Sequence, residues 1–390
     1  MKNFIYDVPT KVYFGKGQVA HLGEELAKYG KTVLLVYGGG SIKRMGLYDQ
    51  VKAEIQKAGL TVVELPGIDP NPRIDSVRAG VKLCKEHGVD VILAVGGGSV
   101  IDASKAIAGG ALVDFDAWDF VSKHISITKA LPLVTVLTMA ATGSEMDAVA
   151  VISNLATKEK DAIWGDALAP KVSFLDPENT YTVPKYQTAC GCADIMSHLL
   201  ETYFNPGESM YMLDSMMESV MKTVVKYAPI ALEKPDNYEA RANIMWAASW
   251  AINGLFKSAQ YQVWACHGLE HELSAYYDIT HGLGLAILTP RLLKYWLDET
   301  NVQRYVNLGV NVFGLDADKE PMALAEETLE ALSHFLYADL GLKNTLTAIG
   351  IGEEHIKEMA KAACAHKGGT IHGFKDMLPE DVEKVYRMCL

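Results

Sequence analysis

The sequence has no long apolar run, no excess of positive charge and no repeated C-x-x-C spacing, and each absence argues against a class of function. No stretch approaches about 18 uninterrupted apolar residues, so no membrane-spanning helix is expected. The N-terminal residues 1–10 contain no long apolar h-region, so no secretory signal is expected either. With 36 Lys and Arg against 48 Asp and Glu, the net charge of -12 argues against a nucleic-acid or anionic-membrane surface. We therefore expect a cytoplasmic protein without nucleic-acid or membrane partners.

The six cysteines are scattered along the chain, which argues against both a zinc ribbon and a secreted disulfide framework. Cys190 and Cys192 are two residues apart and lie just before Asp194, so a thiolate metal site is one interpretation of them. Small buried thiols are the interpretation that we favour.

The chain of 390 residues exceeds the size at which a single hydrophobic core stops growing, so about two domains are expected. In the first half, short apolar runs alternate with helical stretches. The apolar runs predicted as strands are residues 4–6, 11–14, 32–37, 61–65, 89–95 and 132–137, and the helical stretches include 47–58 and 74–87. This alternation predicts a βαβ series, which forms a doubly wound, mostly parallel sheet with helices on both faces.

Two further apolar runs, 148–152 and 172–175, extend the α/β half to about residue 180. Beyond that point, long segments of helical period rich in Ala, Met, Leu and Glu replace the runs of Val, Ile and Gly. We therefore expect an α/β domain over residues 1–180 and an all-α domain over residues 181–390.

Two glycine-rich turns each follow a predicted strand and precede a helix. They are Gly38-Gly39-Gly40-Ser41 and Gly96-Gly97-Gly98-Ser99. Glycines at such a turn let backbone N–H groups point at an anion, and the helix N-terminus adds a favourable dipole. Neither run matches G-x-G-x-x-G or the Walker pattern, so a tight βα turn is the alternative for either one alone.

Two such turns in one sheet, together with the hydroxyl-bearing strand end at residues 138–145, favour a nucleotide site beyond the carboxyl ends of the strands. The spacing leaves open which of the two turns binds the pyrophosphate.

A candidate metal-binding set of one carboxylate and several histidines lies between residues 194 and 281. Asp194 and His198 are four residues apart, as are His267 and His271, so on helices each pair lies on one face. Together with His281 they can converge on a divalent metal through oxygen and nitrogen ligands. An isolated Asp/His pair is more often a helix-surface pair. Here the histidines have small or apolar neighbours, where an unpaired charge is costly and a cation is the simplest partner.

This combination resembles the iron-containing (group III) alcohol dehydrogenase family, most closely its branch of butanol dehydrogenases and NADPH-dependent aldehyde reductases. The matching segments cover nearly the whole chain and are residues 9–17, 96–102 and 142–145, Asp194 with His198, and residues 267–281. The resemblance implies a dinucleotide-binding domain over residues 1–180 and a helical metal-binding domain over residues 181–390, a fold shared with dehydroquinate synthase. It also implies a homodimer.

The resemblance further implies roles for individual residues. Asp194, His198, His267 and His281 match the metal ligands, and His271 matches a histidine that lies beside the nicotinamide. In the second glycine turn, Gly97, Gly98 and Ser99 match the pyrophosphate loop of the family, and Asp102, Thr138, Thr142 and Lys160 match positions that line the cofactor.

The first glycine turn bears on the choice of cofactor. NAD-using members of the family carry an acidic residue near the position of Gly38 or Gly39, and this chain has none there. A carboxylate would repel a 2′-phosphate, whereas the glycines, Ser41, Lys43 and Arg44 can accept one. We therefore expect NADP(H) to be preferred, with NAD(H) as the alternative. For the metal, Fe²⁺ and Zn²⁺ both suit an Asp/His₃ set.

The implied chemistry is reversible hydride transfer between the nicotinamide and a primary alcohol or aldehyde similar to butanol or butanal, with the metal as a Lewis acid. His271 is expected to relay the alcohol proton to solvent. One alternative is a glycerol or diol dehydrogenase of the same family. A lyase of the dehydroquinate-synthase type needs Lys and Arg for a phosphorylated acid, and residues 267–281 are poor in both. A binding protein without catalysis is the remaining alternative.

Overall fold

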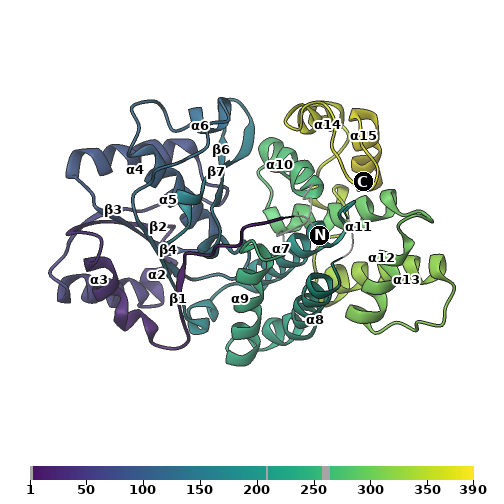
Figure 1. Ribbon diagram of the computed structural model, residues 1–390, viewed down its shortest axis with the longest axis horizontal. Coiled ribbons are helices and arrows are strands. Elements are labelled where there is room, and N and C mark those ends of the chain that lie inside the picture. The colour runs from purple at the N-terminus through teal and green to yellow at the C-terminus, as the bar shows by residue number, and fades with distance from the viewer. Residues whose placement is uncertain (1–2, 208–209, 257–263) are drawn as a thin grey trace. The chain divides into compact units, whose positions relative to one another are not determined.

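The computed structural model describes residues 3–207, 210–256 and 264–390, which divide into two compact units (Figure 1). The α/β unit comprises Asp7–Val183 and Pro235–Ser249. The helical unit comprises Met1–Tyr6, Pro184–Lys234 and Trp250–Leu390. Most of helix α9 (Tyr238–Ile252) thus belongs to the α/β unit.

Six parallel strands form the main sheet of the α/β unit, in the order β1-β8-β5-β4-β2-β3. Their bounds are β1 Lys11–Phe14, β2 Thr32–Tyr37, β3 Thr61–Leu65, β4 Val91–Gly96, β5 Leu133–Leu137 and β8 Val172–Leu175. Its helices, besides α9, are α1 Leu22–Ala27, α2 Ser41–Arg44, α3 Leu47–Lys57, α4 Ile74–His87, α5 Gly98–Gly110 and α6 Asp119–Ser122. The predicted parallel sheet is confirmed.

Two hydrophobic cores lie on opposite faces of this sheet. Because successive strand residues point to opposite faces, Val33 and Leu35 of β2 join one core while Leu34 and Val36 join the other. Helices α1, α2 and α3 cover the first face, and α4, α5 and α6 cover the second. Figure 1 shows α3 on one side of the strands and α4 and α5 on the other. The strands are therefore apolar on both faces, as a doubly wound fold requires.

Two strand expectations differ from the structure. Residues 4–6 form no strand, because pairing begins at Lys11, where β1 joins β8. The run at 148–152 becomes β6 (Val149–Asn154), which does not join the main sheet. It pairs antiparallel with β7 (Glu159–Trp164), which was not predicted because its sequence EKDAIW carries three charged residues.

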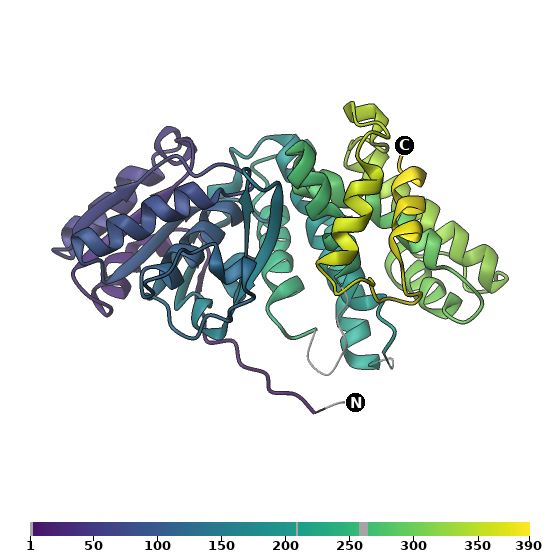
Figure 2. The same cartoon turned by 90° about the horizontal axis from the view of Figure 1, so that it is seen from above.

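The helical unit contains no strand among its described residues, apart from an isolated bridge between Ile371 and Met377. Figure 2 shows these helices in a view turned by 90° from that of Figure 1. They are α7 Lys185–Tyr203, α8 Tyr211–Glu233, α10 Ala265–Tyr277, α11 His281–Trp296, α12 Val302–Leu308, α13 Pro321–His334, α14 Ile356–Ala365 and α15 Pro379–Met388. None of the helices that the structure describes is long and apolar enough to cross a membrane.

Candidate metal centre and nucleotide-binding edge

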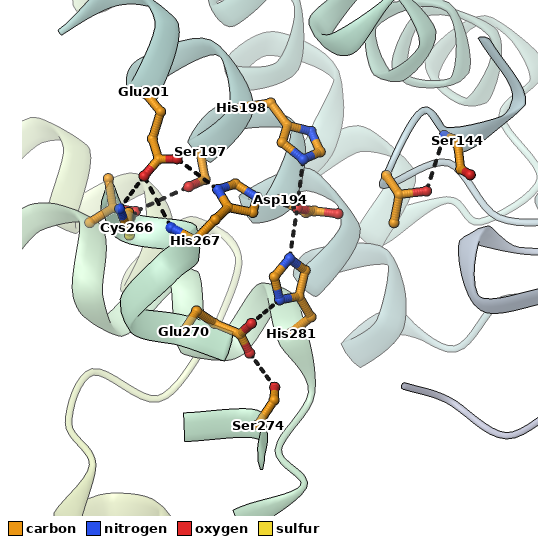
Figure 3. A network of polar contacts seen from close by, with 12 residues as sticks. Ser144, Asp194, Ser197, His198, Glu201, Cys266, His267, Glu270, Ser274 and His281 are labelled. Carbon is orange, nitrogen blue, oxygen red and sulfur yellow. Dashed lines mark hydrogen bonds and ion pairs between the residues drawn. The ribbon is translucent and has the colours of Figure 1, made fainter. Parts of the chain in front are cut away.

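Asp194 is surrounded by three histidine side chains in the helical unit (Figure 3). Its Oδ1 lies 3.5 Å from Nε2 of His198 and 3.8 Å from Nε2 of both His267 and His281. Helix α7 carries Asp194 and His198 one turn apart, α10 carries His267, and α11 begins with His281. The structure thus brings together the four side chains that the sequence indicated as metal ligands.

The spacing of these atoms suits a shared cation better than direct hydrogen bonds. Oδ1 of Asp194 and Nε2 of His267 are buried and form no hydrogen bond within the described residues, which is costly unless an ion is bound. Two atoms that each lie about 2.1 Å from one tetrahedral ion are about 3.4 Å apart. The ligand atoms of Asp194, His267 and His281 lie within 4.8 Å of one another. The centre therefore fits a divalent ion.

Burial and charge act in opposite directions on these groups. Burial raises the pKa of Asp194, but the three neighbouring imidazoles outweigh it and hold the pKa well below its ordinary value. Burial lowers the pKa of His267, but Glu201 and Asp194 outweigh it and raise the pKa to about 9. The centre therefore favours positive charge, which a divalent ion supplies together with bonds to the ring nitrogens.

Two further buried carboxylates contact the outer nitrogens of two of these histidines. Oε2 of Glu201 lies 2.9 Å from Nδ1 of His267, and Glu270 hydrogen-bonds Nδ1 of His281 (Figure 3). With Nδ1 held in this way, Nε2 of each ring faces Asp194, as is common in metal centres. The motifs did not indicate either glutamate. Their positions in the sequence could have indicated them, since Glu201 and Glu270 each lie three residues after a predicted ligand, on the same side of a helix.

A glycine directly after His281 lets α11 approach α7 closely. A Cβ atom at Gly282 would lie 2.1 Å from the carbonyl oxygen of Cys190, so a larger residue would push the two helices apart. Cys190 lies one turn before Asp194, and this close contact therefore helps to set the distance between Asp194 and His281. All six cysteines are buried thiols that form no disulfide bond within the described residues, which confirms the interpretation of small buried thiols.

The two glycine turns and the polar strand end each follow one of three adjacent strands, and all three lie at the same edge of the sheet. Tyr37 of β2 pairs with Val95 of β4, and Gly96 of β4 pairs with Leu137 of β5. The segments that follow these strand ends are 38–41, 97–99 and 138–142. Their side chains and backbone groups thus meet at the carboxyl edge, where open α/β sheets bind ligands.

The segments 97–99 and 138–142 approach each other closely because Gly97 and Gly98 carry no Cβ atom. A Cβ at Gly98 would lie 2.3 Å from Oγ1 of Thr142, and one at Gly97 would lie 3.3 Å from Cβ of Met139. Gly98 is also the first residue of α5, where the first backbone N–H groups have no partner inside the helix. The edge therefore offers free N–H groups, a helix dipole and a threonine hydroxyl to an anion.

Asp102 lies in a hydrogen-bond network behind the second glycine turn, and Lys160 lies on the β6–β7 hairpin. Asp102 accepts a hydrogen bond of 2.6 Å from the Ser144 hydroxyl and one of 2.9 Å from the Val151 N–H. Burial raises its pKa to about 6, against the opposing charge of Lys105. Lys160 is buried on β7, the partner strand of the β6 that carries Val151. Their contact with the cofactor stays a prediction.

The sequence profile described as iron-containing alcohol dehydrogenase matches residues 9–177, and the profile described as the C-terminal part of the Fe-containing alcohol dehydrogenase family matches residues 188–390. The chain belongs to the iron-containing alcohol dehydrogenase family. Family membership confirms the resemblance that the motifs indicated.

Relatives within this family are similar over nearly their full length. NADH-dependent butanol dehydrogenase A of Clostridium acetobutylicum is 49% identical, and the match covers 99% of both chains. The NADPH-dependent aldehyde reductase of Escherichia coli is 37% identical over 94% of both chains. The crystal structure of NADH-dependent butanol dehydrogenase A of Thermotoga maritima superposes with a TM-score of 0.95 at 40% identity, covering 100% of this chain and 99% of that one.

Proposed function

We propose that the protein is a metal-dependent oxidoreductase that transfers a hydride between NADP(H) and a primary alcohol or aldehyde similar to butanol or butanal. The observation that carries the proposal is the convergence of Asp194, His198, His267 and His281 in a chain of this family. The names of the relatives, butanol dehydrogenase and aldehyde reductase, support the substrate class.

Asp194, His198, His267 and His281 would hold a divalent ion, Fe²⁺ or Zn²⁺, through one carboxylate oxygen and three imidazole nitrogens. A divalent ion there supplies Lewis-acid stabilisation of negative charge on the substrate oxygen during hydride transfer. The protein keeps the ligands in place from three helices, which fixes the geometry before substrate binds.

The glycine turns 38–41 and 96–99 are proposed to bind the phosphates of the cofactor. Their backbone N–H groups and the start of α5 provide the donors, and Thr138 and Thr142 add hydroxyl groups. Asp102, which is held by hydrogen bonds from Ser144 and Val151, and Lys160 on β7 are proposed to contribute to the same cofactor surface.

A spectrophotometric assay of butanal-dependent NADPH consumption tests the function. We expect turnover with butanal and NADPH and the reverse reaction with butanol and NADP⁺. A glycerol or diol dehydrogenase would prefer polyols in an alcohol panel. A lyase of the dehydroquinate-synthase type, or a binding protein without catalysis, would show no butanal-dependent consumption, and that result would reject the proposal.

The first glycine turn provides a test of cofactor preference. No carboxylate lies between Tyr37 and Arg44, and a Cβ at Gly39 would contact nothing within 4 Å, so a larger residue fits there. Since a like charge beside the 2′-phosphate costs several kcal/mol, Gly39→Asp is expected to lower kcat/KM for NADPH roughly 10²-fold. The value for NADH should change less.

Gly39→Asn is the matched control, because it has nearly the same shape without the charge. The measurement is kcat/KM with both cofactors for the wild type and the two variants. A clear advantage for NADH in the wild type would reject the proposed preference, and relatives named for NADH make this comparison necessary.

His271 is proposed to relay the alcohol proton. It lies one turn after His267 on α10, and its ring centroid is 6.5 Å from that of His267 and 6.0 Å from that of His281. His271→Ala is expected to lower kcat about 10²-fold and to change the pH dependence of kcat, while the metal content stays at the wild-type level. Full activity across the pH range would remove this role, and a loss of metal would show that His271 is a ligand.

We also propose a homodimer in the cytoplasm. Six buried thiols without a disulfide fit a reducing compartment. Sedimentation equilibrium is expected to show twice the chain mass of 42.6 kDa, and a monomer at micromolar concentration would contradict the dimer.

A further inference from the structure

Glu201 accepts hydrogen bonds from both sides of its carboxylate (Figure 3). Oε1 accepts from the backbone N–H groups of Cys266 and His267, the latter at 3.1 Å. Oε2 lies 2.9 Å from Nδ1 of His267. The two backbone donors belong to the first turn of α10, where N–H groups have no partner inside the helix and need an outside acceptor.

We propose that Glu201 is a positioning residue that keeps the proton of His267 on Nδ1 and thereby sets the affinity of the centre for its divalent ion. A carboxylate can only accept, so the ring nitrogen that faces it must carry a proton. The lone pair then lies on Nε2, the nitrogen that faces Asp194. This inference rests on the proposed function, because it presupposes the metal centre.

Glu270 contacts Nδ1 of His281 as Glu201 contacts Nδ1 of His267, but the partner of its second oxygen is a hydroxyl group, which can either donate or accept. One oxygen is hydrogen-bonded to Nδ1 of His281, and the other accepts from the hydroxyl of Ser274. A hydroxyl can donate or accept. The Ser274 oxygen also lies 3.4 Å from the carbonyl oxygen of Ile279, towards which its proton can turn.

Glutamine substitutions distinguish the two glutamates. In Glu201→Gln, the single amide oxygen cannot serve the donors on both sides. If it faces the backbone, the amide NH₂ faces His267 and requires a lone pair on Nδ1, which moves the ring proton to Nε2. If the NH₂ faces the backbone, it meets the N–H groups of Cys266 and His267, which are also donors.

In Glu270→Gln, by contrast, the amide oxygen can keep its bond to Nδ1 of His281 while the NH₂ donates to Ser274. Each substitution removes one negative charge from a carboxylate that contacts Nδ1 of a predicted ligand. The pair is therefore matched in charge, and it differs in the hydrogen-bond pattern that the new side chain can form.

The test is the dissociation constant for Zn²⁺ and for Co²⁺, measured on the full chain by competition with a chelating indicator. Glu201→Gln is expected to weaken binding by about 10- to 100-fold, as is usual when an outer partner of a metal-binding histidine is lost. Glu270→Gln is expected to stay near the wild-type value. The Co²⁺ absorption spectrum should change in Glu201→Gln, because one nitrogen no longer points correctly. Thermal unfolding of the metal-free forms shows whether each variant is folded.

Equal weakening in the two variants would assign the effect to charge and overturn the inference, as would unchanged binding in Glu201→Gln. A direct readout on the wild type does not depend on either variant. The ¹⁵N-histidine NMR spectrum of the Zn²⁺-loaded protein is expected to show the proton of His267 on Nδ1, and a proton on Nε2 would overturn the inference. A wild type that binds neither ion would overturn the metal centre itself, which the other outcomes leave intact.

Discussion

Replacing Asp194 with alanine is expected to remove the metal and the activity together. Oδ1 of Asp194 is the atom that Nε2 of His198, His267 and His281 all approach within 3.8 Å, so its loss takes away the only carboxylate of the predicted ligand set. Losing an outer partner alone costs about 10- to 100-fold in metal affinity, so losing a direct ligand should cost at least about 10²-fold. Without the Lewis acid, we expect turnover to fall below detection.

Metal content by mass spectrometry and butanal-dependent NADPH consumption are measured on the same preparation. Glu299→Ala is the control, since it removes an exposed carboxylate from the same unit and should change neither value. An Asp194→Ala chain that is active without metal would contradict the ligand assignment.

Replacing Lys105 with methionine is expected to destabilise the α/β unit by about 3–5 kcal/mol, the usual cost of leaving a buried charge without its partner. The Lys105 side chain is fully buried, and its ammonium group donates to the Val149 carbonyl at 2.8 Å, to the Ser144 hydroxyl at 2.9 Å and to Asp147. Ser144 in turn donates to Asp102. Removing the cation leaves Asp147 without its ion-pair partner and Asp102 without the opposing charge of Lys105.

The same network joins α5, which begins at the second glycine turn, to the segment that follows Thr142. We therefore expect the KM for NADPH to rise in Lys105→Met as well. Denaturant unfolding gives the change in stability, and Lys123→Met is the control. Lys123 pairs with Asp119 on an exposed surface, where such a pair contributes about 0–1 kcal/mol. A Lys105→Met protein as stable as the control would contradict the role of this buried cation.

The main sheet could be predicted from the sequence because its strands are buried on both faces. In β2 and β4 nearly every side chain is apolar, and such runs are recognisable without knowledge of their neighbours. The β6–β7 hairpin could not be predicted in this way, since β7 is polar and its pairing comes from contact with β6. Residues 4–6 have the composition of a strand but no partner strand among the described residues, and strand formation depends on partners.

The candidate metal centre was predictable within each helix but not between helices. The spacing of Asp194 and His198 places both on one face of α7, as the helical repeat requires. Their approach to His281 depends on the contact between Gly282 and the backbone of Cys190, which no local pattern contains. Glu201 was missed because a helical glutamate is usually exposed, and its burial arises from tertiary packing that includes its contact with the first turn of α10.

The central claim is that a divalent ion held by the helical unit is required for hydride transfer. It is tested most directly by measuring the metal content and the butanal-dependent NADPH consumption of the wild-type chain before chelation, after chelation and after return of Fe²⁺ or Zn²⁺. We predict one ion per chain, loss of activity when it is removed, and recovery when it is restored. Full activity in a chain free of metal would contradict the account.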